Sequence, residues 1–434
     1  MKTISKIKIL SVTMVVLVLL QSCKEKNTDT KTNVTTNNVN YTQVATGQVH
    51  AYDEDGNIVT NLKPGDSLYG QDAHYSKGHK MSFEKNDNGT VTDNNTGLMW
   101  QAIPTTEGFS WKDAKAYCEN LELGGYDDWR LPTAKELYSI SDFSEGWPYL
   151  DTTYFSLVNN EYVDKSEQYW ADNAYVGYTE EGKYSAAFGV NHATGHIKAY
   201  AGEAPEGMKD RKGPPEGEGK PERQERPEGE EEGHRPPPPG GQNGDRPKGN
   251  PMLKHVRAVR GNTYGENDFQ DNGDNTITDK ATGLMWSKPD SEKGLDWKNA
   301  LTYAENSELA GYTDWRLPNV KELQGIVDYN FAPGAKDADL NRAAIDPIFK
   351  TSEISNENGD KDYPYFWTST SARFQKGKPY YYAWYVAFGR AVNNEGIDFH
   401  GAGAVRFDTK HENGPASEGG ERYYNYVRLV RDVN

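Results

Sequence analysis

The sequence has few cysteines, a deficit of basic residues and no recognisable catalytic motif. Its 434 residues include only two cysteines, so disulfides cannot be the main support of the fold. Lysine and arginine total 48 against 65 aspartates and glutamates, a formal charge of −17, which argues against nucleic acid as a partner. The patterns of phosphate-binding loops, dinucleotide folds, serine hydrolases and zinc proteases are missing. What remains is an acidic chain without an evident reaction centre.

The N-terminus has the pattern of an export signal. Three lysines precede an apolar run at residues 9–20 that is short for a membrane span, and Leu20-Gln21-Ser22-Cys23 follows. This resembles a bacterial lipoprotein cleavage site, with residues 1–22 as signal peptide and Cys23 as the lipidated residue. An ordinary secretory signal is the alternative. Lys24 after the cysteine favours the outer membrane, and residues 23–40, rich in Thr and Asn, are predicted to be a flexible tether.

A long segment of the chain occurs twice. Thr-Gly-Leu-Met-Trp at 96–100 returns at 282–286, and Asp-Trp-Arg-Leu-Pro at 128–132 returns at 314–318, both 186 residues later. Later matches need gaps, among them Phe188-Gly189 with Phe388-Gly389. The unit is too long for a solenoid repeat, so the pattern indicates a duplicated domain.

The centre of each copy predicts an extended segment, a turn at proline and a short helix. Thr133 and Asn319 are good N-caps, and Glu136 and Glu322 stand where a capping box needs them. The tryptophan should anchor a core, and the arginine should pair with an acid or with carbonyl groups. A catalytic arginine is the alternative, but the segment offers neither nucleophile nor base. These structural motif residues are Trp129, Arg130, Pro132, Trp315, Arg316 and Pro318.

Helices and strands alternate in an α+β pattern. Ser110 and Asp296 should cap helices at 111–121 and 297–309, and aromatic strand-like stretches follow later in each copy. Asn-Gly turns near residues 88 and 272 predict hairpins. A calcium loop at the second turn is the alternative, although its carboxylates, Asp271, Asp274 and Asp279, lack EF-hand spacing.

A polar segment interrupts the first copy. Half of the 22 prolines lie within 205–251, together with Gly, Glu and Arg, and large apolar residues are almost missing. Such a composition cannot offset the entropy of ordering, so residues 201–251 are predicted to be a disordered insertion. Because Val256-Arg257 matches Val427-Arg428 at the end of the second copy, the first domain spans 41–262 and the second 263–434.

The repeated string, with a closing Val-Arg strand, resembles the Lcl C-terminal domain family. Its Arg-Leu-Pro-Thr segment is similar to that of the C-type-lectin-like superfamily. The resemblance implies two tandem C-type-lectin-like domains, each with two short helices and a short-stranded antiparallel sheet. In the family the helix cysteine often pairs with one in the closing strand. Here Cys118 would face Ala258, and the second copy has Ala304 and Leu429. Cys118 is therefore expected to be a buried, inert thiol.

One constellation in the second copy is a candidate ligand site. Asp398, His400, Arg406 and Asp408 lie in a glycine-rich stretch without a counterpart in the first copy, and Tyr381 and Trp384 precede it. Small residues allow close approach of backbone to ligand. A metal site from Asp398 and His400, or a salt-bridged surface loop, are the alternatives.

These features predict a non-enzymatic outer-membrane or cell-surface lipoprotein that binds a glycan or an extracellular protein. Aromatic residues make up 12% of the chain, which suits stacking on sugars and also suits β-rich cores. No cofactor is expected, with calcium as a lesser possibility. An enzyme that uses Asp398, His400 and Arg406, and a structural envelope protein, are the other hypotheses.

The lipid anchor gives a first prediction. Changing Cys23→Ser should release the protein from membranes, because the lipid would be the only strong membrane contact. Fractionation of cells that express the variant measures this. Continued pelleting with membranes would contradict the lipoprotein assignment.

Overall fold

The computed structural model describes residues 41–159, 163, 165–179, 184–201, 252–417 and 419–433. The predicted signal peptide, Cys23, the tether and nearly all of the predicted insertion lie outside the described residues. Within the described part of the chain no helix is long and apolar enough to cross a membrane.

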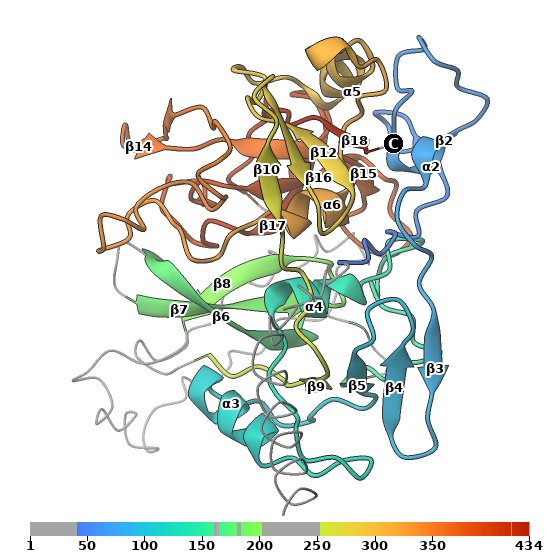
Figure 1. Ribbon diagram of the computed structural model, residues 1–434, viewed down its shortest axis with the longest axis vertical. Helices are drawn as coiled ribbons and strands as arrows, with labels where there is room; N and C mark the ends of the chain where they lie inside the picture. The colour runs from blue at the N-terminus through green and yellow to red at the C-terminus, as the bar shows by residue number, and fades with distance from the viewer. Residues whose placement is uncertain are drawn as a thin grey trace, which may run out of the picture. The chain divides into compact units, whose positions relative to one another are not determined.

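The helices are short (Figure 1), and four of them begin at the caps predicted from the sequence, Ser110, Thr133, Asp296 and Asn319. They are α2 (Asp72–Tyr75), α3 (Trp111–Glu119), α4 (Ala134–Ser139), α5 (Trp297–Glu305), the 3-10 helix η1 (Leu309–Gly311) and α6 (Val320–Gly325). Ser110 and Asp296 each accept an N–H from the third helical residue of α3 and α5, as predicted. Both helices end earlier than predicted, because Asn120 and Asn306 leave helical geometry.

Each copy contains a four-stranded antiparallel sheet that its closing strand completes. The orders are β3 (Phe83–Lys85), β4 (Thr90–Asp93), β5 (Met99–Gln101), β9 (Val259–Arg260), and β10 (Phe269–Asp271), β11 (Thr276–Asp279), β12 (Leu284–Ser287), β18 (Val430–Asp432). The predicted Asn-Gly turns connect β3 to β4 and β10 to β11. Two small hairpins, β1 (Ala51–Tyr52) with β2 (Ile58–Val59) and β13 (Ile354–Ser355) with β14 (Lys361–Asp362), lie outside these sheets.

The remaining strands of both copies form a single six-stranded antiparallel sheet. Its order is β15 (Tyr365–Ala372), β16 (Tyr382–Ala387), β17 (Val405–Thr409), β8 (Ile197–Ala201), β7 (Tyr184–Asn191) and β6 (Gln168–Thr179). The copies meet where β17 pairs with β8, at Val405 opposite Ile197. These strands are counterparts, so the joint has the self-complementary form of a twofold dimer interface. The fold is thus mixed α and β, with mostly antiparallel sheet.

One predicted sequence match between the copies is wrong. Val190 pairs with the first residue of β8, and Val386 pairs with the first residue of β17. Phe188 and Trp384 stand two positions earlier and are therefore counterparts, so the match of Phe188-Gly189 with Phe388-Gly389 is out of register. The Phe-Gly dipeptide occurs in both copies but at different positions relative to the strand pairing, because the loops between the strands differ in length.

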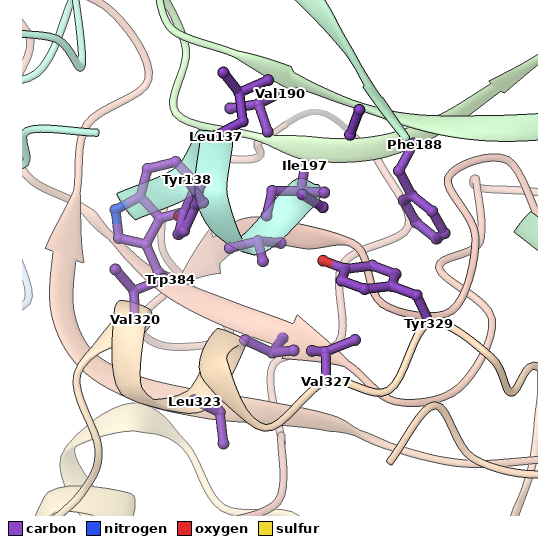
Figure 2. Packing of buried hydrophobic residues seen from close by; sticks show 14 of the residues in the cluster. Leu137, Tyr138, Phe188, Val190, Ile197, Val320, Leu323, Val327, Tyr329 and Trp384 are labelled. Carbon is purple, nitrogen blue, oxygen red and sulfur yellow. The ribbon is translucent and has the colours of Figure 1, made fainter. Parts of the chain in front are cut away.

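A shared core fills the space between the copies. Figure 2 shows α4, with Leu137 and Tyr138, and α6, with Val320 and Leu323, among residues of the six-stranded sheet. The ring of Phe188 meets that of Tyr329 edge-on at 4.6 Å. Because the cluster draws residues from both copies, burial of apolar surface holds them together as well as the strand joint does.

Outside this shared core each copy keeps a cluster of its own, where packing stands in for a disulfide. Cys118 is free and buried beside Trp129 and Ala258. Burial raises the pKa of its thiol to about 12, so it stays protonated, as expected of an inert thiol. Ala304 and Leu429 pack into the corresponding cluster of the second copy.

The repeated tryptophans are buried where the closing strand, the first helix and the central sheet meet. Trp129 is 3% exposed and Trp315 is 1% exposed. Their indole N–H groups donate to the carbonyls of Leu123 at 3.2 Å and Leu309 at 2.9 Å. Both rings therefore fill a core and also satisfy a loop carbonyl.

The repeated arginines bind the glutamates of the predicted capping boxes, which are both present. Arg130 donates to both oxygens of Glu136 at 2.7 and 2.6 Å. Arg316 binds Glu322 in the same way, with both distances at 2.7 Å. The two pairs differ in burial, because the Arg130 side chain is 35% exposed and that of Arg316 only 4%.

This difference gives a matched pair of stability predictions. Arg316→Met should cost about 3–5 kcal/mol in the free energy of unfolding, because it leaves a buried carboxylate without its cation. Arg130→Met should cost clearly less, because the Arg130 side chain is 35% exposed and water already screens its pair with Glu136. Urea unfolding of both variants measures the difference. Equal losses would show that burial does not set the strength of these pairs.

Candidate functional site

Asp398 of the second copy hydrogen-bonds to the first copy, and we call this contact the brace. One carboxylate oxygen accepts the Tyr175 hydroxyl of β6 at 2.6 Å, and the other accepts the Gly401 N–H at 2.9 Å. The Tyr175 oxygen in turn accepts the Ala402 N–H at 3.2 Å. Burial raises the pKa of Asp398 to about 7, and these hydrogen bonds offset that rise only in part.

Arg406 and Asp408 lie together on one face of β17. Arg406 donates to the Tyr385 hydroxyl at 3.3 Å and to the Gly419 carbonyl at 3.2 Å. Asp408 accepts the Arg422 N–H at 3.2 Å and the Asn425 amide at 3.3 Å. Burial also raises the pKa of Asp408 to about 7, although Arg406 lowers it. Both side chains are buried and bonded to their own loops.

The other candidate residues lie elsewhere. Trp384 alternates with Tyr385 along β16, so it points to the opposite sheet face, where it meets Phe143 edge-on at 5.5 Å. His400 is buried, and its carbonyl accepts the Ala199 N–H of β8 at 2.7 Å. Tyr381 is half-buried at the edge of the core. Arg406 and Asp408 thus share one face of β17, Trp384 points to the opposite face, and the contacts of Asp398 and His400 reach the first copy.

The carboxylates of the second hairpin turn are engaged within the turn and its neighbours. Asp271 pairs with Lys288, Asp274 accepts the Thr276 N–H at 3.1 Å, and Asp279 accepts the Asp268 N–H at 3.0 Å. The described ranges contain no group of three His, Cys, Asp or Glu side chains placed to hold a metal ion.

A cavity of about 440 Å³ lies at the junction of the copies, within the range of small-molecule sites. Its walls include Lys135 and Asn173 of the first copy, Tyr264 and Glu266 of the segment that connects the copies, and Tyr329 and Asp346 of the second. We call it the junction pocket. Sequence reasoning missed it because its residues come from five separate stretches of the chain and become neighbours only when the copies join.

The junction pocket is polar and acidic, with aromatic walls. Glu266, Asp328 and Asp346 contribute carboxylates. The only lysine among its lining residues, Lys135, donates to the Gly265 carbonyl at 2.8 Å and to the Asn267 amide oxygen at 2.9 Å. Burial lowers the pKa of Lys135 to about 8. Its bonds therefore hold the connecting segment in place, and the pocket offers acids, amides and rings to a ligand.

The segments that lead into the two copies cross over. The connecting segment, which precedes the second copy, lies on Lys135 of the first. The leading segment of the first copy lies on the second, where Lys321 donates to the Ala45 carbonyl at 3.0 Å. Lys321 also donates to the Ser139 carbonyl of α4 at 2.8 Å, and burial lowers its pKa to about 7. Lys135 and Lys321, which precede the capping-box glutamates, are the motif lysines, and the two leading segments are the arms. Each motif lysine thus binds the arm of the other copy.

A family model described as the Lcl C-terminal domain matches residues 89–208 and 275–431, which correspond to the two copies. Neither the curated proteins nor the solved structures contain a match.

The brace at Asp398 gives a prediction about pH. The folded pKa of about 7 is above the ordinary aspartate value of about 3.9, so the folded state binds more protons between these values. Stability therefore falls as pH rises through this window. Asp398→Asn should reduce the loss of melting temperature between pH 5 and pH 8. The exposed Asp360→Asn is the control, and an unchanged pH profile for Asp398→Asn would refute the assignment.

Proposed function

The chain belongs to the Lcl C-terminal domain family, and we propose that it is a non-enzymatic binding module, an outer-membrane or cell-surface lipoprotein. Its ligand is a glycan or an extracellular protein, and the junction pocket is its binding site. The observation that carries this proposal is a polar cavity of about 440 Å³ that both copies build. Each copy, with two short helices and short antiparallel strands, also suits the proposed C-type-lectin-like fold.

The contacts of the pocket favour a neutral or cationic polar ligand. Carboxylates such as Asp328 and Asp346 accept hydrogen bonds from hydroxyl or ammonium groups, and Tyr329 offers a ring. A neutral sugar or an amino sugar fits this chemistry. A phosphorylated or strongly acidic glycan would meet like charges.

The enzyme hypothesis has less support. Asp398 accepts a hydrogen bond from Tyr175, and Arg406 and Asp408 bond to loops of their own copy. Such bonds to the protein itself are typical of structural side chains. The backbone carbonyl of His400 accepts the Ala199 N–H of β8. A purely structural envelope role would leave the junction pocket without a ligand, and a binding measurement separates that role from ours.

A glycan array with the chain from residue 41 onward tests the proposal. A hit should bind about tenfold more weakly to Asp328→Asn or Asp346→Asn, because each change removes a charge-assisted hydrogen bond. Calorimetry with the purified sugar gives the affinities. Asp339→Asn, an exposed change outside the pocket, is the matched control.

Two results would overturn the pocket assignment. Binding that both pocket variants keep would place the glycan elsewhere on the chain. A glycan array without any hit, followed by no ligand in a screen of envelope proteins, would favour the structural role.

A further inference from the structure

The two arms that cross between the copies differ in length. Ser82 and Asp268 are counterparts, since each carbonyl accepts an N–H from the end of its hairpin, at 2.9 and 2.8 Å. Ala45 and Gly265 are also counterparts, since each accepts a motif lysine. The second arm passes almost directly from 265 to 268. The first arm carries extra residues, 47–80, between the corresponding points.

Residues 47–80 cover the outer edge of the six-stranded sheet in the second copy. The Gln48 amide donates to the Ser371 carbonyl of β15 at 2.9 Å and accepts the Ser371 N–H at 2.9 Å. Asp72 accepts the Thr370 hydroxyl of the same strand at 2.7 Å. Gln48 and Asp72 are 3% exposed. One amide side chain thus satisfies both outward backbone groups of an edge strand.

The first copy has the same edge without this cover. Ala174 is the counterpart of Ser371, because both follow a bulge in the edge strand and pair with Ala187 and Ala383 respectively. Asn173 is the counterpart of Thr370, because their side chains accept the first N–H of α4 and of α6, at 2.8 and 3.1 Å respectively. Ala174 is exposed, and none of the described residues takes the place of Gln48 beside it.

We propose that the edge of β6 at Ala174 docks an extended polypeptide segment of a partner protein. The segment presents an Asn or Gln amide to the N–H and C=O of Ala174, and an acidic side chain beside Asn173. The geometry points to a polypeptide because this chain already satisfies the corresponding edge of β15 with its own Gln48 and Asp72. Addition of a peptide to an open sheet edge is a common recognition mode.

This site is separate from the glycan question. Asn173 borders both places, so a docked segment would reach the rim of the junction pocket, but the contacts at Ala174 do not depend on what the pocket binds. Failure of the glycan array therefore leaves this proposal standing, and failure here leaves the pocket untouched.

The test uses a fluorescent synthetic peptide with the sequence of residues 46–76 and the purified full chain. In the chain the edge of β15 is already covered, so the peptide should find the edge of β6. Anisotropy titrations compare the parent with Ala174→Pro, which removes the outward N–H where an edge strand tolerates proline. Ala174→Ser, the residue of the second copy, is the matched control. We expect Ala174→Pro to weaken binding at least tenfold and Ala174→Ser to bind like the parent.

A change in the peptide removes the risk that a protein variant misfolds. The peptide with Gln48→Ala lacks the amide, and it should lose affinity for the unmodified chain to the same extent. No binding of the parent peptide overturns the proposal. Equal binding to Ala174→Pro also overturns it, because the peptide would then have displaced the resident segment on β15 or bound elsewhere.

Discussion

The fold depends on the buried carboxylate of the capping-box glutamate at the start of a helix in each copy. In each copy the glutamate of the capping box accepts the N-cap N–H, binds both arms of the motif arginine and lies almost fully buried. The arginine backbone pairs with the closing strand, at Val259 or Val430. A single ion pair thus ties the helix, the turn and the last strand of a domain together, and proline sets the angle between them. Glu136 also accepts the Tyr264 N–H, which extends the tie to the connecting segment.

A second constraint follows from placing two such domains on one sheet. Counterpart strands pair at the joint, and counterpart helices pack over the shared core (Figure 2). Because the two copies are nearly symmetric, a feature present in only one of them marks a place where their surfaces differ. The bare edge of β6 lies on the first copy, where the second arm is short, and it borders the junction pocket at Asn173. The corresponding place on the second copy is filled by Asp72, whose carboxylate accepts the hydroxyls of Thr46 and Thr370.

Local features were predictable from sequence, and features made by the joint were not. The N-caps, the hairpin turns and the buried Cys118 follow from rules that act over a few residues, and the structure has them. The constellation from 398 to 408 shows the limit of that approach. Asp398 and His400 lie in the loop before β17 and bond to the first copy, whereas Arg406 and Asp408 share a face of β17 and bond within the second copy. Neither the strand joint nor the arm crossing leaves a periodic or compositional mark, so the site at the junction had no signal to find.

The crossing of the arms also sets an order of events in synthesis. The segment at Ala45 is among the first of the described residues to leave the ribosome, yet the lysine that fastens it is residue 321. The first copy can form its local hairpins and helices while the chain grows, but its leading arm must wait for most of the second copy. Contacts between such distant residues are slow to form and leave apolar surface uncovered in the meantime. A nascent chain of this design therefore leaves the leading segment at Ala45 without its partner until residue 321 has been made.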